Sequence, residues 1–129
     1  ERDFDTDPSA FLNTEAQEDY VNYEPNTRMI VSIAHSWSDY MLMVRGSYWG
    51  ESENYNSGTA QVHDPLWMTD AEFIYAGEEI TLSFGVRNLF DEYPAKGTVG
   101  DTCCGRVYES GSVIPWSGGH YFMKMSREF

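Results

Sequence analysis

Five stretches of the chain alternate apolar and polar residues with a period of two, which is typical of β-strands. They cover residues 29–37, 40–50, 65–76, 79–90 and 115–129. The clearest is 79–90, in which Ile80, Leu82, Phe84 and Val86 alternate with Thr81, Ser83, Gly85 and Arg87. No stretch supports a helix of any length, so the pattern predicts an all-β chain whose strands each have one apolar side.

The connections between these strands alternate in length. Residues 38–39 and 77–78 are tight turns, whereas 51–64 and 91–114 are long loops rich in polar residues or glycine. Transmembrane β-barrels have this arrangement, with tight turns on the periplasmic side and long loops outside. Strands of ~10 residues can also cross a bilayer when tilted. We therefore favour an antiparallel transmembrane barrel over a soluble β-sandwich, which rarely sorts its loops so regularly by length.

The composition is compatible with such a barrel. A net charge of −13 argues against nucleic acid as a partner, because nucleic-acid-binding proteins need a basic surface. No apolar run approaches the ~20 residues of a transmembrane helix, and a mean hydropathy of −0.50 fits strands that alternate in polarity. Aromatic residues gather at the strand ends, as in the girdles that barrels place at membrane–water interfaces. They are Trp37, Tyr40, Tyr48, Trp49, Trp67, Tyr75, Phe90, Trp116 and Phe129.

Residues 1–28 are expected to form an extracellular acidic loop segment, because Pro8 and Pro25 interrupt them and no period is sustained. Residues 29–129 would hold the barrel strands. The first segment contains alternating acids that are candidate ligands of a structural calcium ion, although the glycine and distal glutamate of an EF-hand loop are missing. These candidate ligands are Asp3, Asp5 and Asp7. The simpler alternative is a solvated acidic loop.

The two cysteines, Cys103 and Cys104, are adjacent. A disulfide between neighbours needs a distorted peptide, so a vicinal disulfide that stiffens the loop and a pair of free thiols both remain open. No other metal site and no cofactor are expected, since the chain has no Cys-x-x-Cys pair or histidine cluster.

No catalytic constellation is recognisable, so we do not expect an enzyme. The three histidines, His35, His63 and His120, are scattered. Asp70 and Glu72 share one side of a strand, but a polar barrel interior explains them better than a catalytic pair does. The basic residues on the same sides of their strands would balance these acids or contact a plug; they are Arg45, Arg87 and Lys124.

Two segments resemble the TonB-dependent receptor family. In "ITLSFGVRNLFDEYP" (80–94), a run of five residues matches the end of the family's penultimate strand: Val86, Asn88, Leu89, Phe90 and Asp91. The end of the chain, "GGHYFMKMSREF", is similar to the closing strand of outer-membrane proteins. The matching residues there are Tyr121, Met123, Met125 and Phe129, while Arg127 occupies a position that is usually apolar.

The resemblance implies that the chain supplies about the last five strands of a barrel of about 22 strands with a plugged lumen. It also implies that Phe129 and its strand are the signal for outer-membrane assembly. Such receptors take up a siderophore, cobalamin, haem or an oligosaccharide in Gram-negative bacteria and are energised by TonB through the plug. We expect the rest of the barrel and the plug on another chain or fragment, after a cut in an extracellular loop for example, and the C-terminus in the periplasm.

Substrate contacts would come from aromatic residues near the outer ends of the strands and in the loops. The candidates are Trp49, Tyr55, Tyr108 and Trp116. Each could equally sit in the interfacial girdle or pack a loop. Two other functions remain as alternatives: a soluble extracellular β-sandwich that binds carbohydrate, and a porin-type barrel without a plug.

Overall fold

The computed structural model describes residues 7–97, except 57 and 58, together with 106–108, 112 and 114–128. Its elements are η1 (Pro8–Ala10), α1 (Thr14–Asn22), β1 (Arg28–Trp37), β2 (Tyr40–Trp49), β3 (Ser52–Asn56), β4 (Thr59–His63), β5 (Leu66–Ala76), β6 (Ile80–Arg87) and β7 (His120–Arg127). Neither described helix is long and apolar enough to cross a membrane. The chain is mostly antiparallel sheet, which confirms the all-β class.

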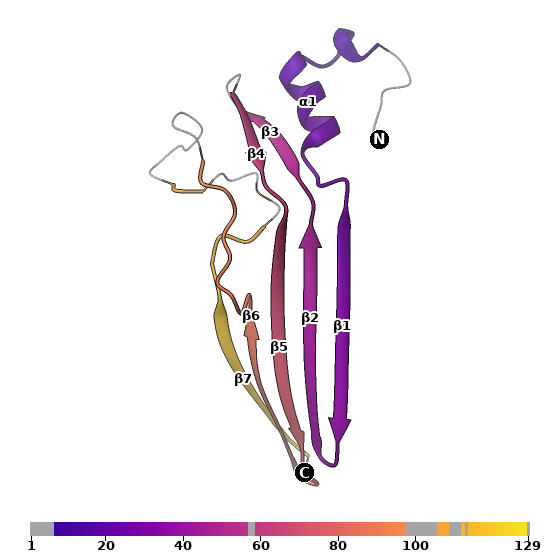
Figure 1. Cartoon of the computed structure of the whole chain (residues 1–129), viewed down its shortest axis with the longest axis vertical. Helices are drawn as coiled ribbons and strands as arrows, with labels where there is room; N and C mark the ends of the chain where they lie inside the picture. The colour runs from indigo at the N-terminus through magenta and orange to yellow at the C-terminus, as the bar shows by residue number, and fades with distance from the viewer. Residues whose placement is uncertain (1–6, 57–58, 98–105, 109–111, 113, 129) are drawn as a thin grey trace. The chain divides into compact units, whose positions relative to one another are not determined.

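Strands β1, β2, β5, β6 and β7 form one sheet in that order (Figure 1). The pairing of β5 with β6 places Phe73 opposite Phe84, and the pairing of β6 with β7 places Phe84 opposite Met123. The Ala76 N–H donates to the Asp39 carbonyl at 2.7 Å, which joins the end of β5 to the beginning of β2. The five predicted strands are therefore confirmed, and neighbours run antiparallel.

Both short turns and the end of β7 lie at one end of this sheet, which we call the turn end. Ser38 adopts a φ of 47° in the two-residue turn between β1 and β2, as turns that fit twisted strands require. In the next turn, the Gly77 N–H donates to the Ile80 carbonyl at 3.0 Å. Ile80 is in turn opposite Arg127 of β7. The two predicted tight turns are thus confirmed, and they lie together with the end of β7.

The chain divides into two compact units, each described by itself. One unit holds most of the five-stranded sheet and comprises Met29–Tyr48, Trp67–Glu92 and Ser117–Phe129. The other comprises Glu1–Arg28, Trp49–Leu66 and Tyr93–Trp116 and contains α1 and the β3–β4 hairpin.

Helix α1 contradicts the expectation of a helix-free chain, and it lies within the predicted loop segment of residues 1–28. The helix begins after Asn13, whose side-chain oxygen accepts a hydrogen bond from the Ala16 N–H at 2.8 Å. Such a cap satisfies an amide that the first turn leaves unpaired. Glu18 then accepts a hydrogen bond from the Asn22 side chain, one turn later, at 3.2 Å. Acidic residues of this segment, among them Glu15 and Glu18, therefore belong to a short helix.

The predicted long polar loop over 51–64 contains two further strands that were not predicted, since β3 and β4 form a hairpin there. One face of this hairpin is polar and yet buried. It carries Ser52, Asn54, Gln61 and His63, each less than 10% exposed. The His63 Nε2 and the Asn54 Oδ1 lie 2.8 Å apart. Since the buried face is not apolar, the hairpin lacks the alternation by which strands are recognised in a sequence.

Two strands are shorter than predicted, for a backbone reason. β6 ends at Arg87 because the next residue, Asn88, has a φ of 52°. β7 begins at His120 rather than near residue 115, and it follows Gly118, whose φ is 68°. Both are left-handed conformations that end a regular strand.

Candidate functional site

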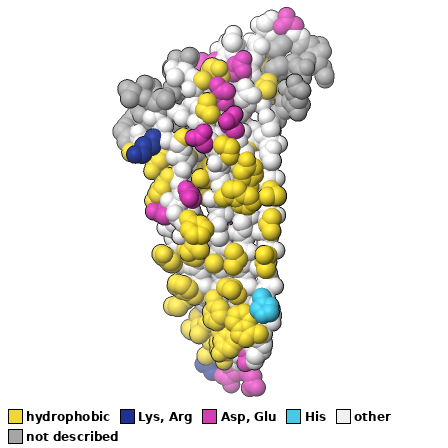
Figure 2. Space-filling view, in the orientation of Figure 1, with side chains coloured by type: hydrophobic (Ala, Val, Ile, Leu, Met, Phe, Trp, Pro, Cys, Tyr) yellow, Lys and Arg dark blue, Asp and Glu magenta, His cyan; other side chains and the backbone are white. Residues whose placement is uncertain are grey.

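One face of the five-stranded sheet is apolar and exposed, and no described residue covers it. The apolar sides of the strands, as predicted, all contribute to it, and Figure 2 shows hydrophobic side chains spread over these strands. Its large members, each at least 38% exposed, are Met29, Val31, Ile33, Trp37, Tyr40, Leu42, Val44, Trp67, Phe73, Ile80, Leu82, Phe84, Tyr121, Met123 and Met125; we call this set the apolar face. The three from β7 are 72–77% exposed.

This exposure is far beyond what a monomer of this size leaves in water. Of the described hydrophobic residues, only Val86 and Ile114 are buried. Contiguous apolar patches on soluble monomers rarely exceed a few hundred Å², and larger ones mark contact with a partner or a membrane. The apolar face therefore needs a cover that the described residues do not supply.

The opposite side of the sheet carries paired charges. Asp70 of β5 accepts from Arg45 of β2 at 2.6 Å and from Arg87 of β6 at 3.1 Å. Its other oxygen accepts from the Asn88 backbone N–H at 3.0 Å. Three strands are thus tied together by one carboxylate whose side chain is only 15% exposed. We call this side, with Glu72 and Lys124, the charged face.

Glu72 and Lys124 form a second ion pair on the charged face, at 3.5 Å. Between the two pairs lies Phe122 of β7, whose ring has the Arg87 guanidinium 5.3 Å and the Lys124 ammonium 4.6 Å from its centre. The ring covers Gly85, since a β-carbon on that glycine would lie 2.3 Å from it. Asp70 and Glu72 are therefore both engaged in ion pairs.

Aromatic rings contact one another at the turn end of the apolar face. Tyr40 lies 5.7 Å from Phe73 and 5.3 Å from Tyr75, and Trp37 lies 6.0 Å from Tyr40, measured between ring centres. We call these four residues the turn-end aromatic cluster. The ring of His35 stacks on Trp37 at 5.5 Å.

A second aromatic contact lies near the other end of β2 and β5. Tyr48 and Trp67 are 5.2 Å apart. The Trp67 ring also packs over Gly46, where a β-carbon would lie 3.3 Å from it. Rings therefore occur at both ends of the apolar strand segments, as predicted.

The run from Val86 to Asp91 forms a hydrogen-bonded bend at the end of β6. Asn88 accepts from the Glu92 N–H at 2.9 Å and donates to the Glu92 carbonyl at 2.7 Å through the same side chain. Asp91, with a φ of 56°, accepts from the Gly119 N–H at 2.7 Å. The two polar residues of the run therefore hold the bend and join it to the chain that enters β7.

The apolar residues of the same run have different environments. Val86 is 8% exposed, whereas Leu89 and Phe90 are 42% and 67% exposed. Together with Gly119 and Tyr121, Val86 and Leu89 line a hollow of about 260 Å³. The sequence motif thus combines a backbone bend with exposed apolar groups.

The four candidate substrate residues are not brought into contact with one another among the described residues. The Arg28 guanidinium lies 3.9 Å from the centre of the Trp49 ring, and these two residues line a small hollow with Glu24 and Pro25. Trp116 is 59% exposed. The arrangement does not form a single aromatic platform.

The other two candidates, both tyrosines, have defined neighbours. The Tyr55 backbone N–H donates to the Asp19 carboxylate at 2.6 Å, and the negative charge of Glu53 raises the pKa of the Tyr55 phenol. The Tyr108 ring stacks on Tyr93 at 5.5 Å and nearly parallel, at 8°. The Tyr108 ring therefore packs against a neighbouring ring, as one alternative for this residue required.

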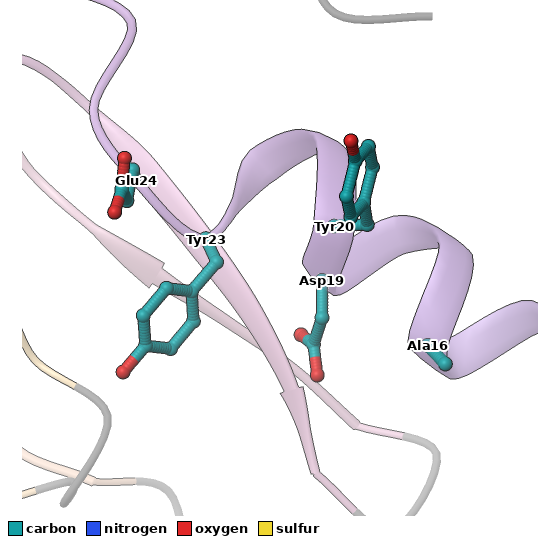
Figure 3. Close-up of a pocket in the computed structure, with 5 residues that line it drawn as sticks. All are labelled: Ala16, Asp19, Tyr20, Tyr23 and Glu24. Carbon is teal, nitrogen blue, oxygen red and sulfur yellow. The ribbon is translucent and has the colours of Figure 1, made fainter. Parts of the chain in front are cut away.

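Sequence reasoning missed an open groove along α1. It has a volume of about 550 Å³ and is lined by Ala16, Asp19, Tyr20, Tyr23 and Glu24. In Figure 3, Asp19 and Tyr23 point to the same side of the helix, and Tyr20 points away from them. Asparagine at position 13, followed by a run of helix-forming residues, was the signal that could have revealed the helix.

Several predicted residues fall outside the described part of the chain. These are Asp3, Asp5, Cys103, Cys104 and Phe129. The third candidate calcium ligand, Asp7, accepts a hydrogen bond from the Ser9 N–H, which lowers the pKa of its carboxyl group. No group of three or more potential metal ligands occurs among the described residues.

Arg127, the residue that departs from the closing-strand pattern, lies near Glu79, with its guanidinium 3.4 Å from that carboxylate. Its side chain is 54% exposed.

Comparison with protein-family models, with curated proteins and with solved structures finds no match for this chain.

Proposed function

We propose that the chain forms the C-terminal strands of a β-barrel in the outer membrane of a Gram-negative bacterium, as part of a TonB-dependent transporter. The observation that carries the proposal is the exposed apolar face on an antiparallel sheet whose other side is charged. A barrel wall needs this pairing, because lipid covers one side while water or a plug meets the other.

The spacing of the aromatic rings supports the proposal quantitatively. Tyr40 and Tyr48 on β2, and Trp67 and Tyr75 on β5, are eight residues apart in each case. At about 3.4 Å per residue, each pair spans about 27 Å along its strand. A tilt of about 40° reduces this to about 21 Å across the membrane, close to the ~25 Å apolar band of outer-membrane barrels.

The edges of the sheet require further strands. β1 and β7 each have one side without a neighbour in the five-stranded sheet. In lipid, unpaired backbone groups cost several kcal/mol each. We propose that the remaining strands and a plug belong to another chain or to another part of the same protein, and that the charged face lines the lumen.

The choice of a TonB-dependent transporter rests on the resemblance of Val86–Asp91 and of the closing strand to that family. The bend made by Asn88 and Asp91 gives the two polar positions of the motif a physical role. The transported nutrient would be a siderophore, cobalamin, haem or an oligosaccharide. In this account the plug, not this chain, contacts TonB.

Two neighbouring substitutions test the orientation of the sheet. Val44 lies on the apolar face, about midway between Tyr40 and Tyr48, and Met43 lies on the opposite face. An arginine at the lipid-facing middle of a barrel costs about 2–4 kcal/mol. We expect Val44→Arg to lower the yield of folded protein in outer membranes at least tenfold, and Met43→Arg, the matched control, to change it less than twofold. Equal effects would contradict the assignment of the faces.

The transporter itself is tested by mass spectrometry of the purified membrane complex. A companion polypeptide, or a contiguous N-terminal region, with a plug sequence supports the transporter. A complete barrel without a plug would instead support the porin-type alternative.

A further inference from the structure

The turn end of the sheet combines two features with complementary chemistry, an aromatic cluster and a border of carboxylates. The turn-end aromatic cluster lies on the apolar face, and three of its members, Trp37, Tyr40 and Phe73, are 39–42% exposed. Figure 2 shows acidic side chains at the foot of the sheet, below the hydrophobic surface.

The described carboxylates at this end outnumber the basic groups. Asp39, Glu78, Glu79 and Glu128 are all exposed, and Arg127 is the basic residue beside them. Four negative charges and one positive charge give a local net charge of −3. The Glu128 N–H donates to the Glu79 carbonyl at 3.2 Å, so the end of β7 lies beside the turn between β5 and β6.

The aromatic cluster and the acidic turns are in direct contact. Tyr40 directly follows Asp39 at the first turn. In the second turn, the Tyr75 hydroxyl lies over Gly77, where a β-carbon would approach it to 2.9 Å. Aromatic faces and carboxylates therefore surround the same edge of the apolar surface.

Along β1, alternate side chains change from apolar to acidic toward the turn. Ile33 is 68% exposed and apolar, His35 is exposed and carries ring nitrogens, Trp37 is aromatic, and Asp39 is acidic. A phospholipid presents groups in a matching order from its interior to water: acyl chains, then phosphate, then the terminal headgroup. A protonated or neutral imidazole can donate to phosphate, while aromatic faces and carboxylates attract an ammonium group.

We propose that the turn end binds phospholipids whose headgroup ends in an ammonium group, such as phosphatidylethanolamine, in preference to anionic phospholipids. This inference rests on the proposed function, because it requires the apolar face to lie in lipid. The net negative charge at the turn end favours a zwitterionic headgroup over an anionic one. It attracts the ammonium of a zwitterionic lipid and repels a headgroup that carries only the phosphate charge.

The test is native mass spectrometry of the detergent-extracted complex that contains this chain, mixed with equimolar phosphatidylethanolamine and phosphatidylglycerol of identical acyl chains. We expect more phosphatidylethanolamine adducts than phosphatidylglycerol adducts. A single charge beside a lipid surface contributes about 1 kcal/mol, or about fivefold in binding. Asp39→Asn and Glu78→Gln should therefore each lower the adduct ratio by up to about fivefold.

Matched variants test whether the lipid preference comes from the turn end or from the rest of the barrel surface. Asn is a preferred residue in two-residue turns, so Asp39→Asn removes the charge and keeps the backbone. Trp37→Leu should lower the ratio, whereas Trp67→Leu, the same change at the other end of the apolar face, should leave it unchanged. Heat-modifiable gel mobility verifies that each variant is folded.

The outcomes distinguish the two proposals. A chain that needs no detergent and carries neither lipid overturns the proposed function. A detergent-extracted complex that prefers phosphatidylglycerol, binds both lipids equally, binds neither, or keeps its ratio in Asp39→Asn and Glu78→Gln overturns this inference alone.

Discussion

Replacing Asn88 with alanine tests whether the motif at the end of β6 acts through its hydrogen bonds and its backbone conformation. Asn88 is 7% exposed and has a φ of 52°. Its side chain makes both hydrogen bonds to the Glu92 backbone, at 2.7 and 2.9 Å. Alanine removes both bonds and places a residue without a side-chain amide in a left-handed conformation, which asparagine tolerates better.

The expected loss follows from these contacts. Two hydrogen bonds contribute about 1 kcal/mol each, and a left-handed alanine costs about 1 kcal/mol. Asn88→Ala should therefore lower the free energy of unfolding by about 3 kcal/mol. Asn88→Gly also removes both bonds but adopts the left-handed conformation without cost, so it should lower the free energy of unfolding by only about 2 kcal/mol.

The measurement is urea-induced unfolding of the membrane-inserted complex, followed by tryptophan fluorescence in lipid vesicles. Asn88→Ala should shift the unfolding midpoint about one and a half times as far as Asn88→Gly. A loss below about 1 kcal/mol for either variant would refute the reasoning that this side chain holds the bend.

Three further predictions use the same unfolding measurement. Asp70→Ala should lower the free energy of unfolding by about 2–3 kcal/mol, because it leaves two partly exposed guanidinium groups without their carboxylate. Asp70→Asn should lower it by about half as much, and equal losses would argue against a role for the charge. Gly85→Ala should lower the free energy of unfolding by about 1–3 kcal/mol, because its β-carbon would overlap the Phe122 ring. Combined with Phe122→Ala, the loss should be smaller than the sum of the two single losses. Strictly additive losses would contradict this packing. Gly119→Ala should cost a similar amount, since its β-carbon would lie 2.7 Å from the Asn88 carbonyl oxygen, and a neutral effect would contradict that close approach.

The five long strands could be predicted from their apolar sides, and most clearly where the other side of the strand carries no apolar residue. Alternation is then strict, as in β6, where Leu82 and Phe84 are exposed on one side and Ser83 lies on the other. The two-residue turn at Ser38 could likewise be predicted from its length and position between two such strands.

The helix and the β3–β4 hairpin could not be predicted by the same reasoning. Helix α1 has no buried residue, so it lacks the apolar stripe by which amphipathic helices are recognised. The hairpin buries Asn54 and His63 through a hydrogen bond to each other, and a polar buried face resembles a loop in sequence. In both cases the stabilising contacts are polar and specific to the tertiary structure.

The apolar and charged faces of the sheet could be predicted from the sequence, but the contacts between individual side chains could not. The motif residues were identified from the sequence, but the bond from Asp91 to Gly119 joins residues 28 positions apart and depends on the fold. The central position of Asp70 between two arginines also requires the register of three strands. The acidic turn end could not be predicted, because its charges come from separate turns.

The measurement that tests the central claim most directly is gel mobility of the detergent-extracted protein with and without boiling. Closed outer-membrane barrels resist unfolding in mild detergent and migrate as compact species until they are heated. We predict that this chain remains in the membrane fraction without detergent, is released by detergent, and enters the gel within a compact complex that boiling dissociates or unfolds. A chain that is soluble without detergent, with the same mobility before and after boiling, would contradict the account.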